Sequence, residues 1–127
     1  MMGNAKQVLV IDDETIMRKL LKQILHDKYE VILKENGKEA LEWMYEGNIP
    51  DLVVADLNMP EIDGFEYIKR VRESGFFNDV PLIVLSGEES SSERIKCLKL
   101  GANDYLIKPF NPEELGLRID NLIKLRS

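Results

Sequence analysis

The residues of this sequence that could do chemistry are polar side chains placed directly after short apolar runs. In chain order they are Asp12, Asp13, Asp56, Ser86 and Lys108. Three carboxylates brought together repel one another, and a pair about 4 Å apart costs roughly 4 kcal/mol at an effective dielectric constant of 20. A divalent cation with oxygen ligands, Mg²⁺ above all, relieves that repulsion. A lysine adds positive charge for an arriving anion, so the set suits phosphoryl transfer to a carboxylate.

Each of these residues taken alone has a simpler interpretation. Aspartate and serine are favoured at helix N-caps and in turns, and for Ser86 or Asp12 alone capping is the better explanation. The three acids together favour chemistry, because mutually repulsive carboxylates need a cation to coexist. That argument holds only if the fold brings them to one place.

A parallel sheet would bring them together, and the apolar runs predict one. Residues 8–11, 52–55 and 82–85 are continuously apolar, which is typical of strands covered by helices on both faces. Residues 30–34 and 104–108 predict two weaker strands. The carboxyl ends of parallel strands share one edge of the sheet, where open α/β folds place their ligand sites.

Apolar residues at helical spacing follow each predicted strand. The five stripes begin at Met17, Ala40, Phe65, Ile95 and Leu115. A strand followed by a helix, five times over, predicts an α/β fold with right-handed crossovers and helices on both faces of the sheet.

Composition narrows the class of protein further. The 127 residues suit a single domain over 1–127, and the net charge of −6 argues against a chain that grips nucleic acid through its phosphates. One cysteine, Cys97, allows no internal disulfide, and no apolar run reaches membrane-spanning length. We therefore expect a cytoplasmic protein that contacts neither nucleic acid nor membrane directly.

Five motifs resemble those of the receiver domains of two-component response regulators. In chain order they are VLVIDDE, NGKEAL, DLVVADLNMPEIDGFE, VLSGEES and GANDYLIKPF. The resemblance covers essentially the whole chain and is closest to single-domain, chemotaxis-type regulators. It implies a flavodoxin-like (βα)5 three-layer sandwich whose parallel strands are ordered 2-1-3-4-5.

The resemblance also implies residue roles. Asp56 would be the phosphoacceptor. Mg²⁺, or Mn²⁺ in its place, would be bound by Asp13, Asp56 and the backbone carbonyl of Asn58, with support from Asp12. Lys108 would contact a phosphoryl oxygen, and the bond from Lys108 to the following proline is expected to be cis.

Three further positions complete the expected site. Ser86 would donate a hydrogen bond to the phosphoryl group, and Tyr105 would be an aromatic switch that turns inward when Ser86 moves. Asn58 and Glu88 would orient the water that hydrolyses the phosphoaspartate, so these two residues would tune the lifetime of the phosphorylated state.

The implied partners are proteins. A sensor histidine kinase or phosphotransfer protein would supply the phosphoryl group. A downstream protein, or a second copy in a homodimer, would read the change on the face formed by the fourth helix, fifth strand and fifth helix. Such a protein is a regulator rather than an enzyme, since it catalyses only its own phosphorylation and dephosphorylation.

Two other functions remain open from the sequence. A small phosphohydrolase of the haloacid dehalogenase class also uses an aspartate after a strand, but it needs a second aspartate two residues on, where this chain has Asn58. A flavin-binding module on the same fold needs a glycine- and hydroxyl-rich phosphate loop. The acids at Asp12, Asp13 and Glu14 would repel a phosphate there.

Overall fold

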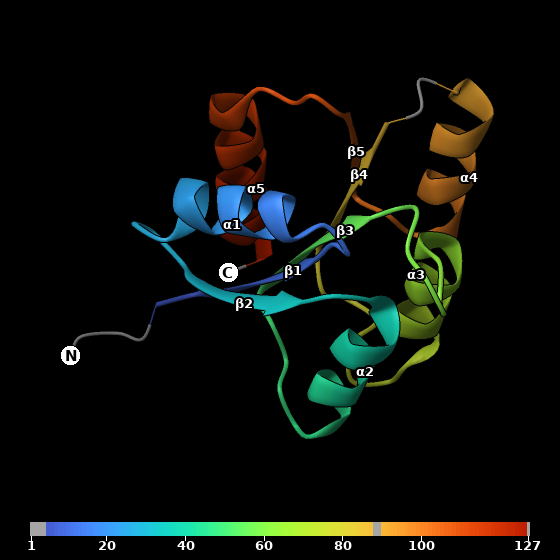
Figure 1. Cartoon of the computed structure of the whole chain (residues 1–127). Helices are drawn as coiled ribbons and strands as arrows, with labels where there is room; N and C mark the ends of the chain where they lie inside the picture. The colour runs from blue at the N-terminus through green and yellow to red at the C-terminus, as the bar shows by residue number, and fades with distance from the viewer. Residues whose placement is uncertain (1–4, 88–89, 127) are drawn as a thin grey trace.

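Five parallel strands form one sheet in the order β2-β1-β3-β4-β5, as the sequence predicts (Figure 1). The structure is a computed structural model that describes residues 5–87 and 90–126. The strands are β1 (Gln7–Ile11), β2 (Glu30–Lys34), β3 (Leu52–Asp56), β4 (Leu82–Ser86) and β5 (Asp104–Ile107). The helices are α1 (Thr15–Leu25), α2 (Gly37–Tyr45), α3 (Gly64–Glu73), α4 (Ser91–Leu100) and α5 (Pro112–Arg126).

The helices cover the sheet on both faces, with α1 and α5 on one side and α2, α3 and α4 on the other (Figure 1). Alternate residues of each strand enter the two cores. In β1, Val8 and Val10 pack with α1 and α5, whereas Leu9 and Ile11 pack with α2 and α3. Because both of their faces are buried, the central strands β3 and β4 are apolar without a break until their last residue at the sheet edge.

Four helices begin with the same local hydrogen bond. In each of them, a side-chain oxygen of the residue just before the helix accepts a hydrogen bond from the backbone N–H of a glutamate three residues further on. The pairs are Asn36 with Glu39, Asp63 with Glu66, Ser90 with Glu93, and Asn111 with Glu114. The glutamates also place negative charge at the positive end of each helix dipole.

Element ends follow the sequence closely. Gly101 takes the left-handed conformation with φ of 116° and ends α4, and the bond between Lys108 and Pro109 is cis. Lys108 lies just past the end of β5 rather than inside it. Over the described part of the chain, every helix is too short or too polar to cross a membrane.

The loop that follows β3 is packed tightly against the start of α3. The Gly64 N–H donates to the Leu57 carbonyl at 2.8 Å. A Cβ at Gly64 would lie 2.8 Å from the Leu57 Cα and 2.9 Å from the Leu57 carbonyl oxygen, which is backbone and has little room to move. The glycine therefore holds the residue next to Asp56 in place.

Gly64→Ala is expected to lower the free energy of unfolding by about 1–3 kcal/mol, because the new methyl group forces the backbone at Leu57 to shift. Urea unfolding measures this. Gly116→Ala is the matched control: it lies inside α5 with nothing within 4 Å of the added Cβ, so it should stabilise by up to about 1 kcal/mol. Equal stability of the parent and Gly64→Ala would show that the loop yields freely.

Candidate functional site

The register of the sheet brings the predicted site residues together. Ile11 of β1 pairs with Ala55 of β3, so the residues that follow, Asp12 and Asp56, lie side by side at the carboxyl edge. On the other side of β3, Ser86 of β4 pairs with Ile107 of β5.

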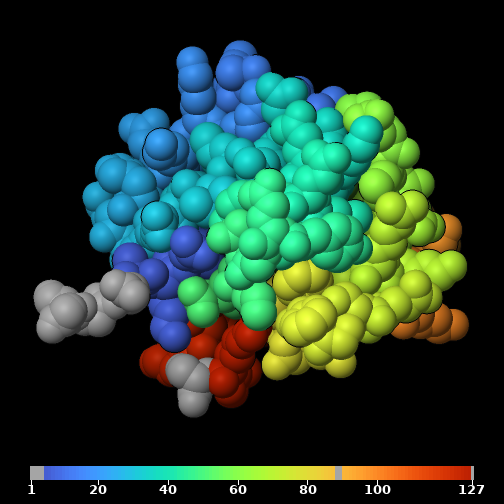
Figure 2. All heavy atoms as spheres, turned by 90° about the horizontal axis from the view of Figure 1, so that it is seen from below, coloured from blue at the N-terminus to red at the C-terminus, as the bar shows by residue number. Residues whose placement is uncertain are grey.

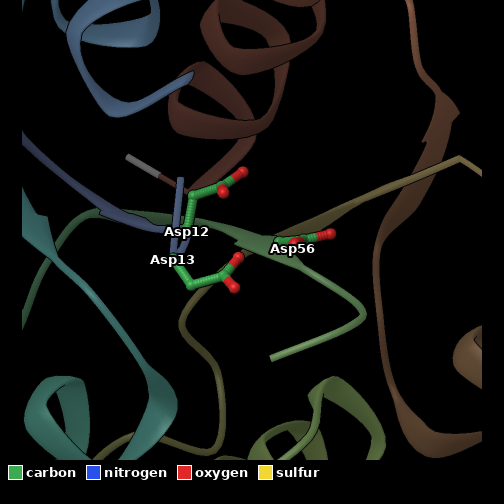
Figure 3. Close-up of side chains that lie close together, drawn as sticks. All are labelled: Asp12, Asp13 and Asp56. Carbon is green, nitrogen blue, oxygen red and sulfur yellow. The ribbon is translucent and has the colours of Figure 1, made fainter. Parts of the chain in front are cut away.

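The three aspartates form a cluster. One carboxylate oxygen from each of Asp12, Asp13 and Asp56 lies within 4.8 Å of the others. Figure 3 shows the side chains projecting from the neighbouring ends of β1 and β3, with Asp13 reaching toward Asp56. Asp12 is 1% exposed and Asp56 7% exposed, whereas Asp13 is open to solvent. The cluster is therefore buried at Asp12 and Asp56 and accessible to solvent at Asp13.

Lys108 is the cation that faces this cluster. Its Nζ donates to Asp12 Oδ2 at 3.2 Å and lies 3.4 Å from Asp56 Oδ1 and 3.9 Å from Glu14 Oε1. Burial opposes the charged ammonium, but Asp56 and then Asp12 outweigh it and raise the pKa of Lys108 above its usual value. The lysine is thus held protonated beside the acids.

Asp56 is the acid of the cluster whose pKa is raised by burial. Burial is the main reason that its pKa rises to about 6, and the neighbouring Asp12 charge adds to the rise. Lys108 and the backbone N–H of Asn58 stabilise the carboxylate and limit the shift. A cation placed here would act in the same direction as Lys108 and favour the ionised acid.

Asp12 is held by residues at the start of α1. The Glu14 N–H donates to Asp12 Oδ1 at 2.9 Å, and Arg18 Nη1 donates to the Asp12 carbonyl at 2.7 Å. Arg18 also donates to Thr15 Oγ1 at 3.1 Å. Arg18 was not singled out in the sequence analysis. The feature that could have identified it is a basic residue one turn into the helix that follows the acidic pair.

Ser86 and Tyr105 are in direct contact at the other half of the edge. Ser86 is fully buried and Tyr105 is 7% exposed. Burial raises the pKa of Tyr105, and hydrogen bonding with the nearby Ser86 side chain limits the rise. Arg94 of α4 lies over the tyrosine ring, 5.7 Å from its centroid. The prediction was that the ring turns inward when Ser86 moves, whereas in this structure the ring is already turned in.

Asn58 and Glu88 are the predicted water-orienting residues. Asn58 is exposed in the loop after β3, and its backbone N–H interacts with the Asp56 carboxylate. Glu88 lies outside the described residues. Asn58 is therefore placed beside the cluster, and Glu88 stays a prediction from the sequence.

The donor set fits a hard divalent cation. The side chains that Mg²⁺ would meet at the sheet edge offer carboxylate oxygens, and exposure of Asp13 leaves room for water ligands. Mg²⁺ prefers such oxygen ligands and commonly keeps several waters.

The family described as the response regulator receiver domain matches residues 8–120. The chain belongs to this family and is the receiver domain of a two-component response regulator, a phosphoacceptor signalling domain. Receiver domains bind Mg²⁺ through an acidic cluster and interact with histidine kinases. The comparisons give no support to the haloacid dehalogenase alternative.

Two curated relatives illustrate the sequence match. Response regulator MprA of Mycobacterium sp. (strain KMS) is 41% identical over 122 residues, which are 95% of this chain and 52% of that protein. The protein named "Probable transcriptional regulator ycf27" of Cyanophora paradoxa is 39% identical over 122 residues, again 95% of this chain and 49% of that protein. The chain spans about half the length of these relatives.

Solved structures share the whole fold. The receiver domain of Francisella response regulator 1452 has a TM-score of 0.88 at 33% identity, over 96% of this chain and 99% of that one. Chemotaxis response regulator CheY4 of Vibrio cholerae has a TM-score of 0.86 at 32% identity, over 94% and 99%. The receiver domain of sensor histidine kinase PA1611 from Pseudomonas aeruginosa PAO1, with a magnesium ion coordinated in its active site cleft, has a TM-score of 0.86 at 27% identity, over 95% of this chain and 99% of that one.

Mg²⁺ is expected to raise the melting temperature, because it binds the folded cluster and not the unfolded chain, with a stabilisation of RT ln(1 + [L]/Kd). Asp13→Ala should remove this response, whereas Asp27→Ala, at an exposed acid, should keep it. Without metal, Asp56→Asn should melt at a higher temperature than the parent, because it removes a buried like charge. A melting curve indifferent to millimolar Mg²⁺ would contradict the metal site.

Proposed function

We propose that this chain is a signalling switch in which Asp56 accepts a phosphoryl group from the phosphohistidine of a histidine kinase or phosphotransfer protein. The observation that carries the proposal is the position of the Asp56 carboxylate. It closes the central strand β3, belongs to the aspartate cluster, and lies 3.4 Å from the Lys108 ammonium. A nucleophile, a cation site and a fixed positive charge thus meet at one point.

The metal ligands would be Asp13, Asp56 and the Asn58 backbone carbonyl, with Asp12 in support. Mg²⁺ is the expected ion, with Mn²⁺ as a substitute, and when bound it neutralises charge on the phosphoryl oxygens. The PA1611 receiver domain, which has magnesium in its active site cleft, supports the choice of ion.

In the transfer step, an ionised Asp56 oxygen attacks phosphorus and the phosphorus–nitrogen bond of the phosphohistidine breaks, so that the imidazole leaves with the electron pair. Lys108 pairs with a phosphoryl oxygen as charge shifts onto it. Ser86 donates a hydrogen bond to a second oxygen. The positions of Ser86 at the end of β4 and of Lys108 directly after β5, its neighbour in the sheet, support these two contacts.

The proposed switch is the hydrogen bond between Ser86 and Tyr105. When the Ser86 hydroxyl donates its hydrogen bond to the phosphoryl group, Tyr105 loses that partner. The tyrosine ring, which lies under Arg94, then settles in a different position. The pair is then a two-state element that the phosphoryl group biases.

The readout surface would be the face of α4, β5 and α5. A hollow of about 640 Å³ lies on it, lined in part by Arg94, Leu98, Tyr105 and Arg118. A downstream protein or a second copy of the chain would dock there. The net charge of −6 supports a protein partner over direct contact with nucleic acid. The chain would act as a regulator that catalyses only its own phosphorylation and dephosphorylation. The cytoplasmic location stays a prediction from the sequence.

Incubation with acetyl phosphate and Mg²⁺ should add one phosphoryl group, detected by intact mass, and EDTA should prevent it. Asp56→Asn should stay unmodified. Asp51→Asn is the matched control, because Asp51 directly precedes β3 at the end opposite Asp56. This variant should be labelled like the parent. Full labelling of Asp56→Asn would assign the acceptor elsewhere.

Phosphorylation, or addition of a beryllofluoride mimic, should shift backbone amide resonances mainly in α4 and β5, because Ser86 and Tyr105 connect the site to those elements. In Tyr105→Phe, which lacks the hydroxyl that bonds to Ser86, the shifts in β5 should shrink. Shifts restricted to α2 and α3 would refute the switch.

The phosphorylated state should be short-lived, because an amide at Asn58 and an acid at Glu88 are suited to orient the attacking water. Asn58→Met and Glu88→Lys should each slow decay of the phosphoaspartate after the donor is removed, and the double variant should decay more slowly still. Asn78→Met, at an exposed amide near the opposite end of the molecule, should decay like the parent. Unchanged decay in both single variants would show that water is positioned by other groups.

A further inference from the structure

An apolar groove lies between the end of α2 and the segment that follows α3, at the end of the sheet opposite the aspartate cluster. Its volume is about 370 Å³. We call it the α2–α3 groove, and its lining residues are Met44, Tyr45, Gly47, Ile49, Phe76 and Phe77. Figure 2 shows the two segments side by side on one face of the molecule, green against yellow.

Three of the apolar side chains that line the groove are presented to solvent, whereas Met44 and Phe77 are buried. Phe76 is 77% exposed, Tyr45 62% and Ile49 47%. The rings form a continuous row, with centroids 5.9 Å apart between Tyr45 and Phe77 and 6.3 Å apart between Phe76 and Phe77. Contiguous exposed apolar surface of this kind marks an interaction site, whereas single exposed residues do not.

The segments that supply the lining residues are acidic. Neither segment, from residue 39 to 51 or from 73 to 80, contains a lysine or an arginine. The exposed acids nearest to the lining residues in sequence are Glu42, Glu46, Glu73 and Asp79. Glu42 and Glu46 are one turn apart on the same side of α2 and flank Tyr45 in sequence, while Asp79 already pairs with Arg126 at 3.6 Å.

We propose that the α2–α3 groove binds an amphipathic segment of a partner protein, with aromatic or leucine side chains in the groove and lysine or arginine against the exposed acids of the two segments. The apolar row supplies the affinity, as large buried side chains do at protein interfaces. The acids select a basic partner by charge complementarity.

A second copy of this chain fits the groove less well. In a twofold symmetric dimer the same patch faces itself, so that Glu42 and Glu46 of one chain would approach the same acids of the other. Like charges across an interface destabilise it. The groove thus favours a different, basic partner.

The location of the groove separates this contact from phosphoryl transfer. The loops that form it lead into the amino ends of β3 and β4, whereas the aspartates stand at the carboxyl ends. A partner bound there leaves the phosphorylation site open, so the chain can be tethered by one surface while it is phosphorylated at another. The inference does not depend on the proposed function.

The test is fluorescence anisotropy with a labelled amphipathic helical peptide that carries leucine and tryptophan on one face and lysine on the other, in buffer containing Mg²⁺. It should bind the parent, more weakly as salt rises. Phe76→Ser, at an exposed position that the fold does not need, should weaken binding about tenfold or more, a difference of about 1.4 kcal/mol. The double change Glu42→Lys and Glu46→Lys should do the same.

The control variants distinguish binding at this groove from nonspecific binding of the peptide. Ile16→Ser, at an equally exposed apolar residue on α1, and Glu113→Lys, at an exposed acid on α5, should bind like the parent. Amide shifts caused by the peptide should map to residues 42–49 and 73–79.

Three results would overturn the proposal. One is equal binding of a peptide in which every lysine is replaced by glutamate. Another is unchanged binding by Phe76→Ser with melting temperature intact. The third is a dimer of the parent in sedimentation analysis that Phe76→Ser abolishes, which would assign the groove to a second copy.

Discussion

The mutual repulsion of three carboxylates at one edge of the sheet is the constraint on which the rest of the structure depends. Two of them, Asp12 and Asp56, are almost fully buried: Asp12 directly follows β1, and Asp56 is the last residue of β3. Such a cluster persists only because the fold supplies compensation. Lys108 provides the charge, and the cores on both faces of the sheet hold the strand ends in register.

The compensation is incomplete, and that is what makes the site useful. Lys108 supplies one positive charge to a cluster of three acids, and the pKa of Asp56 rises to about 6 because burial outweighs the lysine. The metal-free site therefore favours cation binding, and the bound cation and Lys108 together favour a phosphoryl group. The deficit of positive charge that costs stability therefore creates affinity for the cation, and the cation in turn creates affinity for the phosphoryl group.

Much of this arrangement could be predicted from the sequence. The unbroken apolar runs predict the parallel sheet. Because parallel strands share one carboxyl edge, the acids, serine and lysine that follow these runs are predicted to lie together there. Other features depend on how far side chains reach after folding. Arg18 binds the Asp12 carbonyl from the next helix, and Tyr105 is already turned in toward Ser86. The α2–α3 groove joins residues about 30 positions apart, such as Tyr45 and Phe76, so no local pattern reveals it.

The most direct test of the central claim is a crystal structure of the protein with Mg²⁺ and beryllofluoride. The account predicts the beryllofluoride on the Asp56 carboxylate, with Lys108 Nζ and the Ser86 hydroxyl on its fluorines and Mg²⁺ bound by Asp13 and Asp56. Beryllofluoride on another residue, or Mg²⁺ bound away from the aspartate cluster, would contradict it.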